Sequence, residues 1–123
     1  MSPITSFRGK YEFLSNFYRS AEIRIDIDGF LYDNTEVPYQ VLKFTDPDLR
    51  GAFRGLEPGQ AKRLARAYHL EVRPDWKLVN VEVMARLLEQ KFRQGTQLAS
   101  LLVETGNVYL EESNYWHDQY YEN

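Results

Sequence analysis

Residues 76–92, WKLVNVEVMARLLEQKF, hold the clearest helical pattern in this 123-residue chain. Their apolar side chains return every three to four residues, which is the period of an α-helix with one face against a core. These positions are Trp76, Val79, Val83, Met84, Leu87, Leu88 and Phe92. Asp75 precedes the pattern as an N-cap candidate and Gly95 follows it as a stop signal, so the sequence predicts its longest helix here.

Shorter elements are predicted on both sides of this helix. Ile23, Ile25 and Ile27 alternate with polar residues, as in a half-buried strand. Asp28-Gly29 predicts a tight hairpin turn, because glycine adopts a positive φ without steric cost, and the return strand follows. Further helices are expected over residues 35–44 (capped by Thr35), 48–53, 60–68 and 97–104 (capped by Thr96).

The remaining segments lack a period. Residues 7–18 are rich in aromatic side chains and predict an irregular packed segment, and residues 107–123 predict an irregular tail. No repeat or linker divides the chain. The expected fold is mainly α (α+β): one compact helical domain over residues 1–123 with a short N-terminal β-hairpin.

Composition excludes several classes of site. The chain has no cysteine and two histidines, so disulfides, thiolate nucleophiles and cysteine-ligated zinc are ruled out. A net charge of −3 argues against a polybasic nucleic-acid binder. No apolar run is long enough to span a bilayer, and residues 1–10 lack an apolar signal core, which predicts a cytoplasmic protein. Nine tyrosines suggest that some serve for hydroxyl contacts or stacking.

Three polar residues share one face of the helix predicted over residues 35–44. Glu36, Gln40 and Lys43 are four and three residues apart, so their side chains form a stripe. Spacing alone favours a solvated face with a weak Glu–Lys pair over a catalytic group. Lys62 and Arg63 are suited to a phosphate near a helix start, but with Arg66 they also fit an ordinary basic surface.

Aromatic and polar residues also combine near both ends of the chain. NYWHD at 114–118 places Trp116 beside Asp118, which suits a stacked base or sugar ring near a carboxylate; a core plug and a turn residue are the simpler interpretation. Asn16 could contact a base edge or stabilise a turn, and Trp76 could belong to the core or line a cleft.

Several segments, in order along the chain, resemble the NADAR family of YbiA-like N-glycosidases. They are FLSNFY (13–18), TEVPYQVLK (35–43), AKRLAR (61–66), PDW (74–76), VM (83–84), KF (91–92), LLVETG (101–106), LEE (110–112) and NYWHD (114–118). The resemblance implies a mainly helical fold and cleavage of the bond between a ribose phosphate or ADP-ribose and a heterocyclic base. Two substrate classes are implied: riboflavin-pathway intermediates, and ADP-ribosylated guanine in nucleic acid, the latter in defence or phage-like systems that reverse ADP-ribosylation.

The resemblance also implies site residues. The catalytic group would be Glu36, Lys43 and Asp118. The substrate-binding residues would be Asn16, Phe17, Tyr18, Gln40, Lys62, Arg63, Trp76, Trp116 and Tyr121. No metal or cofactor is implied. Either a carboxylate activates water while an acid protonates the leaving base, or a lysine with a lowered pKa attacks the anomeric carbon.

The sequence departs from the family pattern at several positions. Val37 stands where the family has His, Asn80 where it has Lys, and His117 where it has Gly. Family members usually continue into a further helix, whereas this sequence ends at Asn123. Three alternatives follow: the fold compensates, a partner chain or a second copy covers that place, or the chain is a divergent member. The departures keep two alternatives open: a catalytically weakened ADP-ribose or NAD-binding module, and a small interaction protein.

Overall fold

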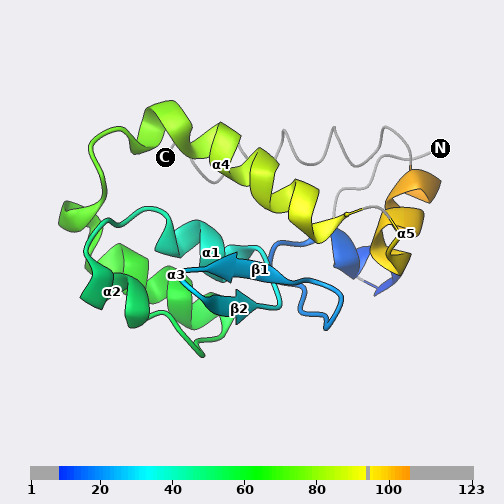
Figure 1. Cartoon of the computed structure of the whole chain (residues 1–123), viewed down its shortest axis with the longest axis horizontal. Helices are drawn as coiled ribbons and strands as arrows, with labels where there is room; N and C mark the ends of the chain where they lie inside the picture. The colour runs from blue at the N-terminus through cyan, green and yellow to red at the C-terminus, as the bar shows by residue number, and fades with distance from the viewer. Residues whose placement is uncertain (1–8, 94, 106–123) are drawn as a thin grey trace.

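The computed structural model describes residues 9–93 and 95–105. These residues form a mainly helical fold with one two-stranded antiparallel sheet, as predicted (Figure 1). In chain order the elements are the 3-10 helix η1 (Gly9–Leu14), β1 (Ile25–Ile27), β2 (Phe30–Tyr32), α1 (Glu36–Val41), α2 (Pro47–Gly51), α3 (Pro58–Ala67), the 3-10 helix η2 (His69–Glu71), α4 (Trp76–Lys91) and α5 (Gln97–Thr105).

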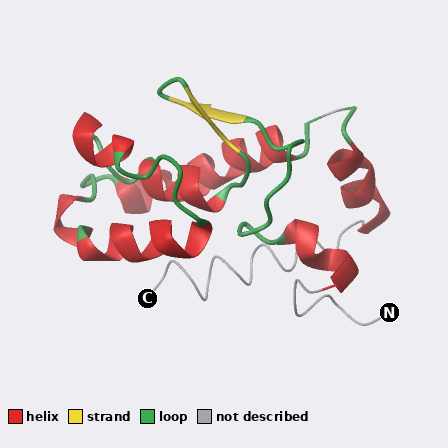
Figure 2. Ribbon diagram, turned by 90° about the horizontal axis from the view of Figure 1, so that it is seen from below, coloured by secondary structure: helices red, strands yellow, loops and turns green. Residues whose placement is uncertain are grey.

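Helix α4 runs along one side of the molecule, and the hairpin and helices α1 to α3 lie on the other (Figure 1). Helix α5 lies at the opposite end of the molecule from α2 in both views (Figures 1 and 2). Helix α1 contacts both α3 and α4. All six residues of α1 are buried, so this short helix is the centre of the core.

The hairpin confirms its sequence prediction. Ile25 pairs with Tyr32 and Ile27 with Phe30, and both turn residues have a positive φ, 55° at Asp28 and 83° at Gly29. Two positive φ values define a turn whose twist matches that of the strands it joins.

The start of α1 differs from its prediction. Thr35 is the N-cap residue, but its side chain makes no cap hydrogen bond. Instead the Asn34 side-chain oxygen accepts from the Val37 N–H at 2.8 Å, while the Thr35 hydroxyl donates to Asn16 Oδ1 at 2.9 Å. Asn34 therefore supplies the cap, and Thr35 ties α1 to the N-terminal segment.

Other boundaries also differ. Helix α1 ends at Val41 rather than near residue 44, because Lys43 N–H and Phe44 N–H turn back to the carbonyls three residues before them. Residues 9–14, expected to be irregular, form η1. Helices α2 and α3 each begin at a proline, since proline at the first helical position lacks only an N–H that would have no helical partner.

The long helix and the last helix follow their predictions. Helix α4 begins directly after Asp75, although the Asp75 carboxylate bonds the Arg73 guanidinium rather than capping the helix. At α5 the Thr96 hydroxyl accepts from the Ala99 N–H at 3.1 Å, as a cap residue does. No helix in the described ranges has both the length and the apolar composition needed to cross a membrane.

Candidate active site

Glu36 is a buried carboxylate at the first position of α1. It is 1% exposed, its N–H donates to the Asn16 carbonyl at 3.0 Å, and its Oε1 accepts from Gln40 Nε2 at 2.9 Å. A carboxylate out of water requires such donors and nearby positive charge. The interpretation of this helix face as solvated is therefore wrong for Glu36 and Gln40.

Gln40 presents a second polar atom in the same place. The side chain is 1% exposed, and its Oε1 accepts no hydrogen bond from the residues that the structure describes. A buried acceptor without a donor is costly, so an incoming N–H or O–H group would be favoured at this atom.

Lys43 follows the end of α1 and is partly buried. Burial lowers its pKa, the Glu36 charge opposes that change, and the positive charges of Lys62 and Arg66 lower the pKa further. Its Nζ lies 5.7 Å from the centroid of the Tyr39 ring. The result is a lysine that loses its proton more readily than a solvated one.

Lys62 belongs to the same charge group. Burial lowers its pKa, Glu36 raises it, and Arg66 lowers it. Helix α3 thus brings Lys62 and Arg66 toward the groups that α1 and its C-terminal turn provide, because residues four apart share a helix face. We call Lys43, Lys62 and Arg66 the cationic cluster; the Glu36 carboxylate acts on its two lysines.

Arg66 is the residue that the sequence left outside the site. The sequence paired Lys62 with Arg63 as phosphate ligands, whereas Arg66 is the arginine that acts electrostatically on both Lys43 and Lys62. Both arginines are exposed, and what distinguishes them is that Arg66 lowers the pKa of Lys43 and of Lys62 whereas Arg63 is not among the causes of either shift. The spacing of four residues between Lys62 and Arg66 was the sequence signal that could have identified Arg66. The role of Arg63 in substrate binding stays a prediction.

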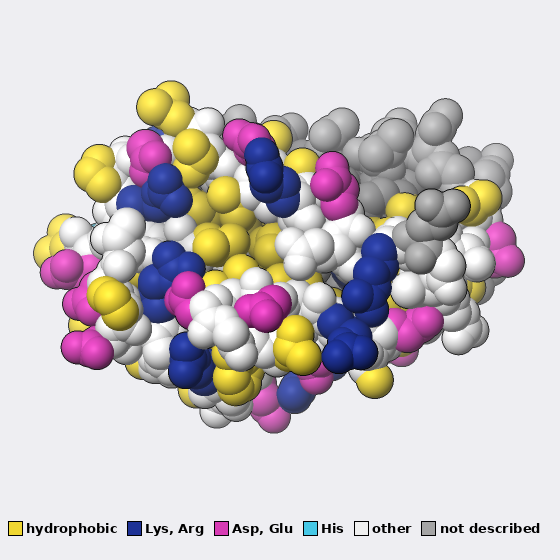
Figure 3. All heavy atoms as spheres, in the orientation of Figure 1, with side chains coloured by type: hydrophobic (Ala, Val, Ile, Leu, Met, Phe, Trp, Pro, Cys, Tyr) yellow, Lys and Arg dark blue, Asp and Glu magenta, His cyan; other side chains and the backbone are white. Residues whose placement is uncertain are grey.

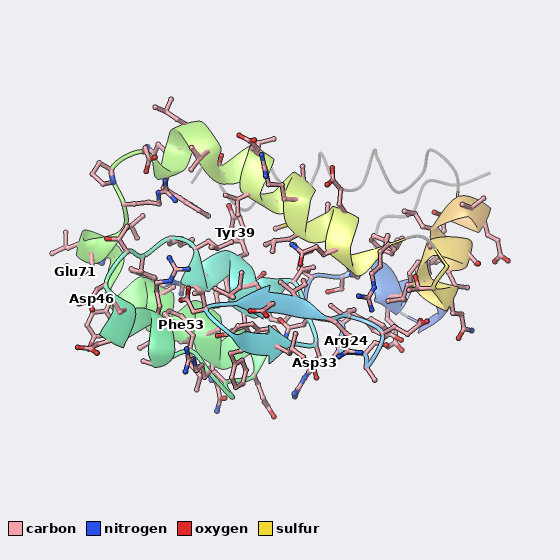
Figure 4. The ribbon with its side chains drawn as sticks, in the orientation of Figure 1. Arg24, Asp33, Tyr39, Asp46, Phe53 and Glu71 are labelled. Atoms are coloured by element: carbon pink, nitrogen blue, oxygen red, sulfur yellow. The ribbon has the colours of Figure 1, made fainter. Side chains whose placement is uncertain are left out.

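Aromatic packing closes the site on the α4 side. The rings of Tyr39 and Trp76 lie 4.9 Å apart, centroid to centroid, and Trp76 is 9% exposed. The Tyr39 side chain lies on the side of α1 that faces α4 (Figure 4). Hydrophobic side chains gather in the same region of the surface, and acidic and basic side chains surround them (Figure 3). Trp76 is therefore packed against the core and connects α4 to Tyr39 on α1.

The segment 15–18 supports Glu36 from the other side, and we call it the 15–18 turn. The Tyr18 N–H donates to the Ser15 carbonyl at 3.1 Å. Both oxygens of Asn16 accept hydrogen bonds from the start of α1: the carbonyl accepts from the Glu36 N–H, and Oδ1 accepts from the Thr35 hydroxyl. The oxygen atoms of Asn16 thus serve structure, as one of its two sequence interpretations proposed, while Phe17 is 40% exposed.

Lys91 is a buried lysine that the sequence noted only as part of a motif. It is 0% exposed and its Nζ donates to the Ser15 carbonyl at 2.8 Å. Burial lowers its pKa to about 7. The available signal was position, because Lys91 follows Met84 and Leu87 on the apolar stripe of α4.

Some predicted site residues lie outside the described residues. They are Asp118, Trp116 and Tyr121, together with the substituted position His117. Their approach to Glu36 stays a prediction. Of the other substitutions, Val37 is fully buried in α1 and Asn80 is half-buried on α4. Over the described ranges, no group of three histidine, aspartate or glutamate side chains is placed to hold a metal ion.

Comparison with known proteins identifies relatives over most of the chain. The NADAR domain family matches residues 6–121. A riboflavin biosynthesis protein of Vibrio vulnificus is 38% identical over 104 residues, which are 84% of this chain but only 28% of that protein. The N-glycosidase YbiA of Escherichia coli is 30% identical over 120 residues, 94% of this chain and 75% of YbiA. No solved structure matches the chain significantly.

Proposed function

This chain belongs to the NADAR domain family, and from that premise we propose that it hydrolyses the N-glycosidic bond between a phosphorylated ribose and a heterocyclic base. The single observation that carries the proposal is Glu36, a buried carboxylate at the first position of α1 whose charge acts on two partly buried lysines, Lys43 and Lys62. Relatives named N-glycosidase and riboflavin biosynthesis protein support this reaction class.

The cationic cluster favours a substrate that carries phosphate. Lys43, Lys62 and Arg66 outnumber the carboxylate of Glu36, so an anionic ligand would balance the site. The Arg66 guanidinium can bond two phosphate oxygens at once. A ribose phosphate or an ADP-ribose conjugate provides both this negative charge and a sugar next to it.

Glu36 is suited to act at the anomeric carbon. A carboxylate there stabilises the positive charge that develops on the sugar as the base leaves, or it activates the attacking water. The hydrogen bond from Gln40 and the backbone contact with Asn16 fix its position. In the water route we place Asp118 as the second acid–base group that protonates the leaving base.

Lys43 supplies a second route. Its lowered pKa increases the fraction of neutral amine, the form that attacks carbon. In that route the neutral Lys43 nitrogen bonds to the anomeric carbon as the base leaves with a proton. The bond between the anomeric carbon and the ring oxygen then breaks to give the imine of the opened ribose, with the proton from nitrogen going to the ring oxygen, and water hydrolyses this imine to free the sugar. Borohydride reduction during turnover separates the routes, because only the imine becomes a stable link between Lys43 and the sugar.

One observation favours a weaker alternative. Val37 is fully buried where family members have a histidine, so that position offers no group that exchanges protons. A chain that has lost turnover but retains the cationic cluster would bind ADP-ribose or NAD without cleaving it. Parallel measurements of ligand binding and base release distinguish this binding module from the hydrolase.

The placement of Arg66 makes the first prediction. Arg66→Ala is expected to weaken ADP-ribose binding about 10- to 100-fold, since a charge-assisted contact with phosphate is worth roughly 1.5–3 kcal/mol. Isothermal titration calorimetry measures the affinity. Arg86→Ala, which removes an exposed arginine of α4, is the matched control and should stay within about 2-fold of the parent affinity. Equal losses in the two variants would contradict the assignment of Arg66 to the site.

A further inference from the structure

Lys91 combines features that neither the core nor the proposed chemistry explains. It ends the apolar stripe of α4, and its ammonium group lies near the rings of Phe92, at 5.1 Å, and Tyr18, at 6.0 Å. Its one hydrogen bond among the described residues is to the Ser15 carbonyl. No carboxylate in those residues forms an ion pair with it.

A buried ammonium without a counter-charge is expensive. Methionine or leucine would fill the same position on the stripe without the cost of removing a charge from water. Its contact with the Ser15 carbonyl is therefore the feature that distinguishes lysine from an apolar residue here. That carbonyl also accepts from the Tyr18 N–H, so Lys91 holds the point where the 15–18 turn closes.

The 15–18 turn leads directly to Glu36. Asn16, next to Ser15, accepts from the Glu36 N–H at 3.0 Å and from the Thr35 hydroxyl at 2.9 Å. One hydrogen bond from Lys91 to Ser15 and two from the start of α1 to Asn16 thus connect the end of α4, the turn and the start of α1. Residues 76 positions apart in the sequence meet at the Lys91–Ser15 bond.

We propose that Lys91 is a positioning residue for the active site: it holds the 15–18 turn against α4, and the turn fixes Thr35 and Glu36 at the start of α1. That the positioned residue Glu36 is catalytic rests on the proposed function, whereas the contacts that connect it to Lys91 do not. A charged donor makes the stronger bond to a carbonyl, and the lowered pKa of Lys91 means that this bond weakens as pH rises above about 7.

The test compares Lys91→Met with Lys77→Met, which removes an exposed lysine from the same helix. Two readouts are used: hydrogen exchange at the Glu36 amide, and kcat for base release. Lys91→Met is expected to speed hydrogen exchange at the Glu36 amide about 10-fold and to leave exchange at the amides of α3 unchanged. It should lower kcat about 10-fold while KM stays close to the parent value. Lys77→Met should match the parent protein in both readouts.

Several results would overturn the proposal. One is exchange at Glu36 within about 2-fold of the parent protein; another is an equal loss of protection across α3, which indicates a structural role. Lys91→Leu guards against an effect of methionine itself, and unfolding of both variants would also contradict positioning. If the parent protein releases no base, the proposed function fails, and the exchange readout still decides the role of Lys91.

Discussion

Glu36→Gln is expected to lower the rate of base release about 1000-fold while ADP-ribose still binds. Glutamine preserves the size of the side chain and can still accept from Gln40 Nε2, so the buried packing at the start of α1 is retained. It removes the negative charge that would stabilise the sugar cation or activate water. The cationic cluster then loses the opposing charge of Glu36, so affinity for ADP-ribose should be unchanged or higher.

Rates from single-turnover assays, together with calorimetric affinities, check this prediction. Glu89→Gln is the control, because Glu89 is exposed on α4 and should leave both quantities unchanged. A Glu36→Gln protein that keeps more than about a tenth of the parent rate would remove Glu36 from the chemistry. A protein that loses binding as well would place Glu36 in ligand recognition instead.

Lys91→Met is expected to make the unfolding free energy less dependent on pH. The lysine pKa is about 7 in the folded protein and about 10.4 in an unfolded chain, so between these values the unfolded chain binds more protons. Stability of the parent protein therefore rises with pH in this window. Below about pH 7 the folded state carries the full cost of the buried charge. From pH 6 to pH 9 the parent protein should gain about 2–3 kcal/mol relative to the variant.

Urea unfolding at several pH values from 6 to 9 measures this difference. Lys77→Met should run parallel to the parent protein, because Lys77 is exposed. Parallel curves for the parent protein and Lys91→Met would show that the Lys91 pKa is not lowered. Together with the activity test, the expected result is a lysine that reduces stability near neutral pH while it positions the site.

Local signals in the sequence predict much of the fold. The apolar period of residues 76–92 locates α4, Asp28-Gly29 locates the hairpin turn, and Thr96 caps α5. Each of these signals acts through neighbours in the chain. The start of α1 was predicted incorrectly in its details because Thr35 finds a partner 19 residues away, at Asn16.

The site was only partly predictable for a related reason. Spacing places Glu36 and Gln40 on one helix face, but spacing cannot show that α1 is buried on every side. That burial comes from contacts with α3 and α4, and it changes a solvated polar stripe into a buried carboxylate site. Arg66 and Lys91 were missed because their roles depend on contacts between elements that are far apart in sequence.

Base release by the parent protein tests the central claim most directly. The protein would be incubated with an oligonucleotide carrying ADP-ribosylated guanine and, separately, with a phosphoribosylated pyrimidine of the riboflavin type, and the products would be identified by mass spectrometry. The proposed function predicts that at least one substrate is cleaved: the oligonucleotide to free ADP-ribose and a strand with unmodified guanine, or the pyrimidine compound to free base and ribose phosphate. Glu36→Gln should cleave neither. A folded protein that binds ADP-ribose but cleaves neither substrate would contradict the hydrolase and identify a binding module.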